Sequence, residues 1–178
     1  MTTDDLVDTR HPIDATDAVG IAGSFREALS HFCSGVVVIT AEDADGEPTG
    51  MTVGSFTSIS LDPPLVGFFA GSSSTTLPRV LATGRFSVNV LAEGQDLLAR
   101  SFARSGTDKF AGVSWTRSAN GAPRLDGAHA WIDCDIDDHR VIGDHELVVG
   151  RVSALIVPAP TDPLVFHRSM FRTLGPLS

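Results

Sequence analysis

Apolar residues recur at helical spacing directly after a polar N-terminal stretch. The pattern predicts an amphipathic helix over residues 24–32. Ser24 and Glu27 have the S-x-x-E spacing of a capping box, so we expect the helix to begin at Ser24. Its apolar face is expected to comprise Phe25, Ala28, Leu29 and Phe32.

Strand patterns dominate the rest of the chain. Some segments are rich in β-branched residues, and others alternate apolar and polar positions. Asp45-Gly46 predicts a hairpin turn after the first of them, and Asp62-Pro63-Pro64 ends the second. The predicted strands cover residues 35–42, 55–61, 65–70, 85–92, 130–137, 145–157 and 164–171.

Three of these segments carry more specific predictions. The continuous apolar run over residues 65–70 predicts a buried strand. Cys134 shares one face of its strand with Ile132 and Ile136, while three aspartates occupy the other face. Gly150, in the middle of a long strand, predicts a β-bulge or a close approach of another part of the backbone.

Two more short helices are expected, over residues 77–84 and 94–103, and the first should end at Gly84. The pattern thus contains about seven to nine strands and two or three helices. Strands and helices are not interleaved as in a βαβ fold, so an antiparallel, barrel-like sheet is the simplest architecture.

Composition supports one globular domain. The chain has 178 residues, of which 42% are hydrophobic, with 17 Gly and 10 Pro to form turns. The formal net charge of −9 argues against nucleic acid as the main partner, because phosphate contacts need clustered Lys and Arg. A local basic pocket for a single phosphate is still compatible with this charge.

The two cysteines, Cys33 and Cys134, do not form a disulfide framework, and both are expected to be buried, reduced thiols. The acidic N-terminus has no signal-peptide pattern, and no apolar run reaches the ~20 residues of a membrane helix. We therefore expect a cytoplasmic protein. Residues 1–23 are expected to be a mobile tail, or an arm that orders on a partner, and residues 24–178 to be the folded domain.

The first candidate site is the segment over residues 50–64. Small side chains allow a ligand to approach the backbone closely, and free N–H groups and hydroxyls offer donors. A flat heteroaromatic ring with carbonyl edges would suit such a wall. The alternative is a Gly-rich hairpin packed against a neighbour. The small residues are Gly50, Thr52, Gly54 and Ser55.

The second candidate is the sequence GSSSTT over residues 71–76, which precedes a predicted helix. Hydroxyls and free N–H groups at a helix start can bind an anion. The alternative is an ordinary N-cap formed by Thr75 or Thr76. Lys109 is the only lysine of the chain, and its ammonium group could complete a phosphate site; a solvated surface lysine is the alternative.

Metal and hydrolytic chemistry find no support in the spacing. The possible donors do not follow a compact zinc pattern. No serine lies in a G-x-S-x-G elbow, and His31 and Cys33 diverge on a helix. The donors considered were His129, Cys134, His139, His145 and His167.

Six motifs in order resemble the flavin reductases of two-component flavin-dependent monooxygenases, such as the reductase of 4-hydroxyphenylacetate 3-monooxygenase. The resemblance covers residues 25–174. Its motifs are FCSGVVVITA, GMTVGSFTSISLDPPLV, SSSTTLPRVLATGRFSVNVLA, DKFAGVSW, GDH and PLVFHRSMF.

The resemblance implies a mainly β fold, an antiparallel Greek-key split barrel of the FMN-binding type, which dimerises with flavin near the subunit interface. Ring contacts would come from Thr52, Val53, Gly54 and Ser55. The ribityl chain and phosphate would contact Ser72, Ser74 and Thr75, with Lys109 and Phe110 nearby. The nicotinamide would contact the triplet Gly143, Asp144 and His145, with His145 as the residue implied for catalysis.

The C-terminal motif departs from the family pattern. Arg168 and Phe171 match an Arg-Gly-x-aromatic element, but Ser169 replaces the glycine and phenylalanine stands where tyrosine is common. The implied contacts of Arg168 and Phe171 with the cofactor therefore have the weakest support.

The implied activity is NAD(P)H-dependent reduction of free FMN or FAD by hydride transfer from the nicotinamide C4 to flavin N5. A separate monooxygenase would receive the reduced flavin. The chain has no Arg cluster for a 2′-phosphate, which favours NADH over NADPH. Two alternatives are a split-barrel oxidase with tightly bound FMN and a non-enzymatic flavin-binding protein.

Overall fold

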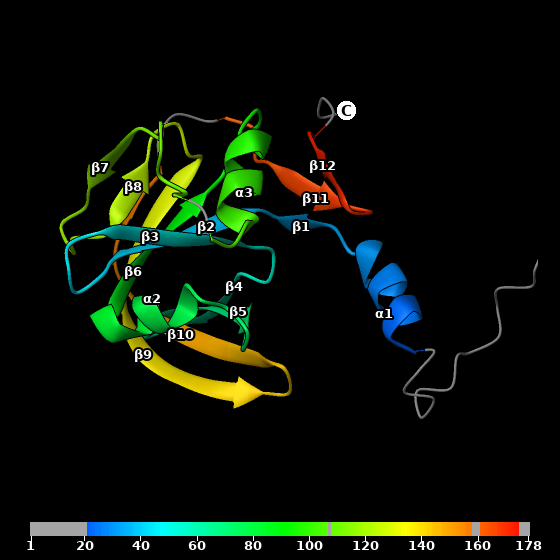
Figure 1. The fold of residues 1–178 in the computed structure, drawn as a ribbon, viewed down its shortest axis with the longest axis horizontal. Helices are drawn as coiled ribbons and strands as arrows, with labels where there is room; N and C mark the ends of the chain where they lie inside the picture. The colour runs from blue at the N-terminus through cyan, green and yellow to red at the C-terminus, as the bar shows by residue number, and fades with distance from the viewer. Residues whose placement is uncertain (1–20, 107, 158–160, 175–178) are drawn as a thin grey trace, which may run out of the picture.

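The computed structural model describes residues 21–106, 108–157 and 161–174. The main element is a seven-stranded antiparallel sheet in the order β3-β2-β6-β9-β10-β5-β4, which curls strongly in Figure 1. In that order, the strands are Pro48–Val53, Val37–Glu42, Arg85–Val90, Ala130–Ile142, His145–Ile156, Pro64–Gly71 and Thr57–Leu61.

Shorter elements surround this sheet. One small sheet has the order β1-β11-β12, and a second pairs β7 with β8. Their strands are β1 Ser34–Gly35, β11 Val165–His167, β12 Met170–Arg172, β7 Trp115–Arg117 and β8 Pro123–Leu125. The helices are α1 Ile21–Ser30, α2 Leu77–Thr83 and α3 Asp96–Ala103. Within the described part of the chain, none of the helices is long and apolar enough to cross a membrane.

The curled sheet does not close into a full circle of hydrogen bonds. Strands β3 and β4 are its two edges, because each pairs with one neighbour in the sheet. The predicted antiparallel, barrel-like sheet is therefore confirmed, and it is open along a seam between β3 and the β4–β5 pair. The seam matters because it places edge backbone and small side chains next to a space that no strand occupies.

Strand β2 separates two apolar clusters. Val37 and Ile39 belong to the cluster inside the curled sheet, together with Phe68 and Phe86. The alternate residue Val38 belongs to a second cluster under α3. Because successive side chains of a strand point to opposite faces, an uninterrupted Val-Val-Ile run is required where both faces are covered.

Gly150 forms the predicted bulge, and the atoms that crowd it belong to side chains rather than to another part of the backbone. The pairing register of β9 and β10 shifts between Val149 and Gly150, which is a bulge. A Cβ atom at Gly150 would lie 2.5 Å from Cζ of Phe86 and 2.9 Å from Cβ of Cys134. Only glycine therefore fits beside the Phe86 ring, which lies within the inner cluster.

Helices α2 and α3 form where the sequence predicts them. Gly84 ends α2 with φ of 69°, and its N–H group bonds to the carbonyl of Leu81, which is the left-handed helix end expected of glycine. The predicted helix over residues 94–103 corresponds to α3, and its buried residues Ala99 and Phe102 face the second cluster.

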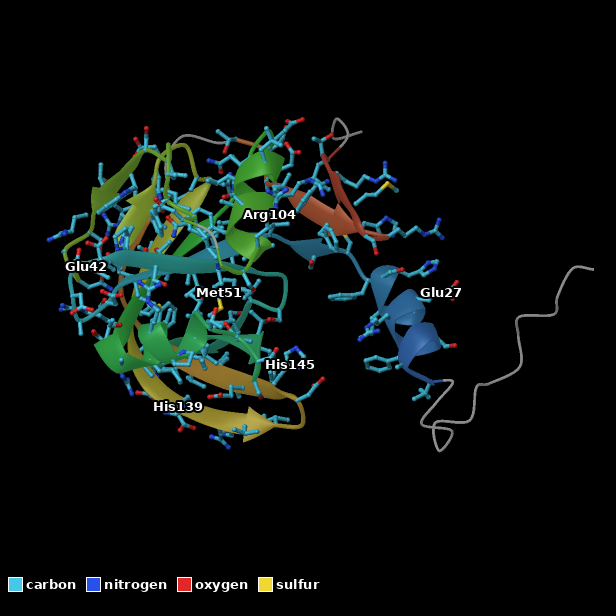
Figure 2. The ribbon with its side chains drawn as sticks, viewed as in Figure 1. Glu27, Glu42, Met51, Arg104, His139 and His145 are labelled. Carbon is cyan, nitrogen blue, oxygen red and sulfur yellow. The ribbon has the colours of Figure 1, made fainter. Side chains whose placement is uncertain are left out.

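The predicted bounds of α1 were wrong at both ends. The helix already includes Ile21, so Ser24 lies inside it and does not cap it, and it ends at Ser30, so Phe32 lies beyond it. The side chains predicted for its apolar face are uncovered, since Phe25 and Phe32 are 59% and 77% exposed. In Figure 2, α1 stands away from the sheet, with side chains on both of its sides. The remaining predicted tail, residues 1–20, lies outside the described residues.

The C-terminal segment is a hairpin rather than the predicted single strand. Strands β11 and β12 pair with each other, and Arg168 and Ser169 form the turn with φ of 49° and 59°. Two consecutive non-glycine residues in the left-handed region are unusual, because Cβ is crowded there. The pattern of residues 164–171 did not reveal the turn, because neither Gly nor Asn marks it.

The two cysteines differ in burial. Cys134 is fully buried in the inner cluster, as predicted. Cys33 is exposed, so its predicted burial was wrong; it lies between α1 and β1. On the other face of β9, Asp133 is also buried, where its carboxylate accepts from Ser87 Oγ at 2.9 Å and pairs with Arg124.

Candidate functional site

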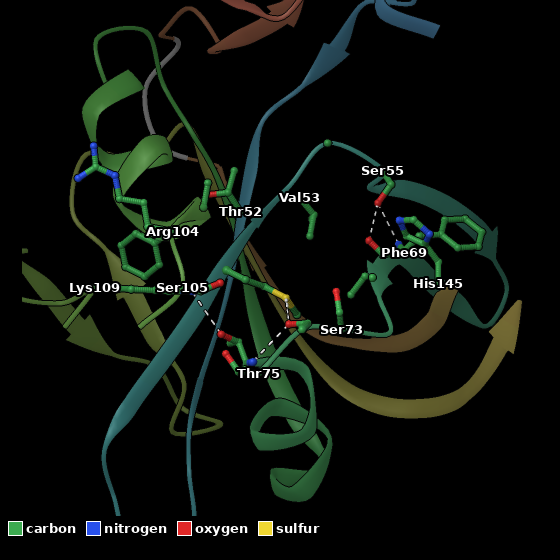
Figure 3. Close-up of a pocket in the computed structure, with 18 residues that line it drawn as sticks. Thr52, Val53, Ser55, Phe69, Ser73, Thr75, Arg104, Ser105, Lys109 and His145 are labelled. Carbon is green, nitrogen blue, oxygen red and sulfur yellow. Dashed lines mark hydrogen bonds between the residues drawn. The ribbon is translucent and has the colours of Figure 1, made fainter. Parts of the chain in front are cut away.

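A cavity of about 460 Å³ opens along the seam of the sheet. Its walls come from the end of β3, the end of β5 with the loop that follows, the C-terminal end of α3, and the start of β10 (Figure 3). The residues that line it are Met51, Thr52, Val53, Gly54, Ser55, Phe69, Ala70, Gly71, Ser73, Ser74, Thr75, Thr76, Phe102, Ala103, Arg104, Ser105, Lys109 and His145.

The predicted small-residue wall borders this cavity and is tied on both sides. Thr52 Oγ1 donates to the carbonyl of Ala99 at 2.7 Å, which fixes β3 against α3. Ser55 Oγ donates to the carbonyl of Phe69 and accepts from its N–H group, both at 2.9 Å. These bonds connect the segment after β3 to β5 across the open seam, so the wall is held without a strand pairing.

The hydroxyl cluster after β5 divides into two groups. Ser74 Oγ accepts from the N–H groups of Thr76 and Leu77 at 3.3 and 3.1 Å, so it caps the start of α2. Thr76 occupies the N-cap position of α2, as one predicted alternative had it, but its side chain makes no capping bond, and Ser74 Oγ accepts from the free N–H groups instead. Ser73 and Thr75 are exposed and line the cavity, with hydroxyls free to contact a ligand (Figure 3).

Lys109 reaches the same end of the cavity. Its Nζ donates to the carbonyl of Gly50 at 2.9 Å and to Thr76 Oγ1 at 3.2 Å. Partial burial lowers the pKa of this ammonium group below its usual value, and the nearby Arg79 cation lowers it further. A cation with only neutral partners, next to a second cation, forms a site that favours an anion.

His145 forms the opposite end. It begins β10 and pairs with Gly71 of β5, whose missing side chain leaves room beside the imidazole. Its Nδ1 lies 2.7 Å from Asp144 Oδ1, and this hydrogen bond holds the pKa of the Asp144 carboxyl below its usual value. Gly143, with φ of 65°, supplies the left-handed residue of the two-residue turn before β10.

The charge of the cavity is opposite to that of the whole chain. Among the described residues that line it, Arg104 and Lys109 are cationic and no carboxylate is present, although the chain carries −9. In the described ranges, no group of three or more His, Cys, Asp or Glu is arranged to hold a metal ion. The cavity thus favours an anionic organic ligand with a flat apolar part.

The structure brings together most of the residues proposed as a site from the sequence. Most of the small wall (Thr52, Gly54 and Ser55) borders the one cavity, as do Ser74, Thr75, Lys109 and His145, whereas Gly50 lines a neighbouring cavity. Gly143 and Asp144 lie in the turn just outside it. Ser72 does not line it; its backbone N–H bonds to the carbonyl of Asp144 at 3.0 Å.

The other three proposed residues have different surroundings. Phe110 packs edge-to-face on Phe102, with ring centroids 4.9 Å apart, and lines a neighbouring cavity. Arg168 lies in the β11–β12 turn with its guanidinium 3.2 Å from Nδ1 of His31. Phe171 packs against the second cluster under the Arg100 guanidinium, 4.8 Å from the ring centroid.

Some residues that line the cavity were not predicted from the sequence to belong to a site. Phe69 was included in an apolar run predicted to be buried, yet it is 37% exposed at the cavity. Strand alternation was the available signal: the buried Phe68 points inward, so Phe69 must point to the opposite face. The residues Phe102–Ser105 at the end of α3 carried no signal, because only the tertiary fold brings this end of the helix to the seam.

Comparison with known proteins identifies this arrangement. Residues 29–175 match the flavin reductase like domain family. A flavin reductase of Pseudomonas putida is 44% identical over 144 residues, covering 81% of this chain and 85% of the relative. The reductase subunit HsaB of a flavin-dependent monooxygenase from Rhodococcus jostii is 41% identical, covering 85% of this chain and 77% of the subunit.

Solved structures agree with these relatives. The NADH:FAD oxidoreductase SgcE6 of Streptomyces globisporus, determined with NAD and FAD fragments, superposes with a TM-score of 0.84 at 35% identity, covering 93% of this chain and 98% of that one. The flavin reductase of styrene monooxygenase from Pseudomonas putida gives a TM-score of 0.78 at 38% identity, covering 86% and 98% of the two chains.

Proposed function

This chain belongs to the flavin reductase-like family, and on that premise we propose that it is an NAD(P)H:flavin oxidoreductase that reduces free FMN or FAD. The reduced flavin then passes to a separate flavin-dependent monooxygenase. Relatives named as reductase subunits of such monooxygenases support this partner. Bound flavin would supply the electron-accepting ring, and the protein supplies its orientation and surroundings.

One observation carries the proposal. The seam cavity joins a narrow wall of small residues to a hydroxyl and ammonium cluster at one end and to an imidazole at the other end. This order matches a flavin whose ring lies along Thr52–Ser55 and whose phosphate lies at Thr75 and Lys109. The nicotinamide would then approach from the side of His145.

Each of these residues has a defined task in the proposed reaction. The hydrogen bonds of Thr52 and Ser55 hold the wall in place, so the protein loses little conformational entropy when it orients the ring. Lys109 offers charge to the phosphate because its present partners are neutral oxygens. His145 positions the carboxamide of the nicotinamide through the ring nitrogen that Asp144 does not use.

We further propose that the working unit is a homodimer. Large apolar side chains that the single chain leaves exposed include Phe25 and Leu29 of α1, Phe32 just after α1, and Leu61 of β4. Contiguous exposed apolar surface in a globular protein generally marks an interaction site. A second copy would cover such surface and narrow the open side of the seam.

The finer choices of nucleotide and location also belong to the proposal. NADH is preferred to NADPH, because the cavity has one exposed arginine, Arg104, rather than the cluster that a 2′-phosphate requires. A cytoplasmic location agrees with two unpaired cysteines, Cys33 and Cys134, since reducing compartments keep thiols free.

A steady-state assay that crosses FMN and FAD with NADH and NADPH tests the proposal. We expect oxidation of NADH to depend on added flavin and to saturate with it. The protein should lose its yellow colour on dialysis, as a protein that uses flavin as substrate does. Absence of turnover in all four combinations would refute the proposed activity, and flavin retained through dialysis would favour a resident-flavin oxidase.

A further inference from the structure

A second cavity lies on the other side of Lys109. It has a volume of about 470 Å³ and shares Thr75, Thr76 and Lys109 with the seam cavity. Its remaining walls are the β2–β3 hairpin, the exposed side of α2 and the segment before β7. They comprise Glu47, Pro48, Thr49, Gly50, Arg79, Gly106, Asp108 and Phe110.

The shared residues lie at the phosphate end of the proposed flavin site. A ligand whose ring occupies the small-residue wall would therefore end at Lys109 if it were FMN. If it were FAD, the same phosphate would continue into a second phosphate, a ribose and an adenine. The second cavity begins where that extension begins, so its position corresponds to the part of FAD that FMN lacks.

The charges at this junction suit two linked phosphates. Lys109 borders both cavities, and Arg79 borders only the second. Arg79 Nε and Nη2 both donate to Asp43 Oδ2, at 3.1 and 2.5 Å, and the planar guanidinium keeps three further N–H donors for a ligand. The two cations lie close enough that Arg79 contributes to lowering the pKa of Lys109, a repulsion that a diphosphate between them would relieve.

The rest of the cavity suits a nucleoside rather than a bare anion. Glu47 and Asp108 add carboxylate acceptors, which repel free phosphate but accept hydrogen bonds from ribose hydroxyls and the adenine amino group. Phe110 is partly buried, and its ring is held by edge-to-face contacts with Phe102 and Trp115. Such a fixed aromatic ring provides an apolar surface on which adenine can pack.

We propose that this second cavity binds the ADP portion of FAD and makes the enzyme selective for FAD over FMN, with Arg79 as the residue that determines this choice. The inference rests on the proposed flavin reductase activity. NADH carries the same ADP group, so the test must separate these two sources.

The test compares Arg79→Ala with the wild-type protein in NADH oxidation with either flavin. We expect wild type to have a lower KM for FAD than for FMN. Loss of a charged contact should raise the KM for FAD about tenfold in the variant, with the KM for FMN changed less than twofold. Arg79→Lys should retain part of the FAD preference, because it keeps the charge.

A matched control is Arg117→Ala. Arg117 is also an exposed arginine in an ion pair, with Glu42, and it borders neither cavity. This variant should keep the wild-type ratio of the two KM values. If it lowers the preference for FAD as strongly as Arg79→Ala does, a general charge effect explains the result and the proposal is overturned.

Two further readouts separate the sources of the ADP group. With FMN as the flavin, Arg79→Ala should leave the KM for NADH unchanged; a rise would assign the cavity to NADH and overturn the FAD assignment. Calorimetric titration with ADP should show binding to wild type and about tenfold weaker binding to Arg79→Ala. Equal changes for FMN and FAD would also refute the inference, whereas absence of turnover with both flavins would refute the proposed activity itself.

Discussion

Asp144 Oδ1 lies 2.7 Å from Nδ1 of His145. The carboxyl group is ionised at neutral pH, because the hydrogen bond from His145 holds its pKa below the usual value. An ionised carboxylate only accepts hydrogen bonds, so Nδ1 must carry the proton. In the neutral imidazole, Nε2 is then an acceptor, which suits the amide N–H of a nicotinamide carboxamide.

We predict that His145→Ala raises the KM for NADH by roughly tenfold, about the value of one lost hydrogen bond at the upper end of the usual range. The KM for flavin should change much less. Steady-state kinetics with each substrate varied in turn measures both constants. His139→Ala is the matched control, because His139 has a similar exposed fraction, 52% against 49%, and does not line the cavity.

Lys109 gives a prediction with a pH dependence. Lys109→Met should raise the KM for flavin roughly tenfold at neutral pH, since a charged contact to the phosphate is lost. In the wild type, burial lowers the pKa of Lys109 below its usual value, so the ammonium is lost at a lower pH than that of an exposed lysine. The KM for flavin should therefore rise as the pH increases through that lowered pKa.

The matched variant for this prediction is Lys109→Arg. A guanidinium keeps its charge throughout the alkaline range. Its KM for flavin should be nearly independent of pH where the wild-type value rises. An identical alkaline rise in both proteins would assign the titration to another group.

Gly150 gives a prediction about stability. Gly150→Ala places a methyl group against the Phe86 ring and Cβ of Cys134, both inside the packed core. Overpacking of this kind costs about 1–3 kcal/mol, and chemical denaturation should show the loss. Gly35→Ala is the control, because nothing lies within 4 Å of its added Cβ. If Gly150→Ala is as stable as the wild type, the space beside Phe86 and Cys134 is not as tight as described.

The β11–β12 turn should become more stable with glycine. Ser169 has φ of 59°, where an L residue is strained by about 1 kcal/mol. Ser169→Gly should therefore raise the free energy of unfolding by up to about that amount, and the melting temperature by roughly 2–4 °C. Ser169→Ala keeps the Cβ atom and should show no such gain, so equal stabilisation by both variants would reject the backbone explanation.

The thiols should react unequally. Burial raises the pKa of Cys134 to about 12, with a smaller contribution from Asp133 and Asp135, so its thiolate is absent at pH 8. Cys33 is exposed. A chromogenic disulfide reagent should therefore modify one thiol in the native protein and two after unfolding, and Cys33→Ser should leave no reactive thiol in the native state.

Local patterns predicted those parts of the fold that local chemistry determines. Gly84 ends α2 in the left-handed conformation that glycine alone adopts easily. The sequence predicted a bulge or a close backbone approach at Gly150, and the bulge is the alternative that the structure has, because an isolated glycine in a long strand marks such a local feature. The small residues of the cavity wall were also predicted, because the size of a side chain can be read directly from the sequence.

Contacts made between distant segments were harder to predict. Whether the apolar face of α1 is exposed depends on what packs beside it. The spacing of its apolar residues is the same as in a helix whose apolar face is buried. Phe69 was grouped with its buried neighbours, although it points to the face of β5 opposite the buried Phe68 and is exposed there. The approach of Arg104 and Ser105 to the seam follows from the placement of α3, which the sequence pattern does not encode.

The way in which Ser55 is held across the open seam affects how fast a ligand can exchange. Two hydrogen bonds between the Ser55 side chain and the Phe69 backbone span the seam. The cavity lies along the open side of the seven-stranded sheet, so a ligand can leave it without breaking any strand pairing of that sheet. For the flavin proposed to bind there, the lifetime on the protein would depend on the ligand's own contacts, and release to a second protein would not require the sheet to open.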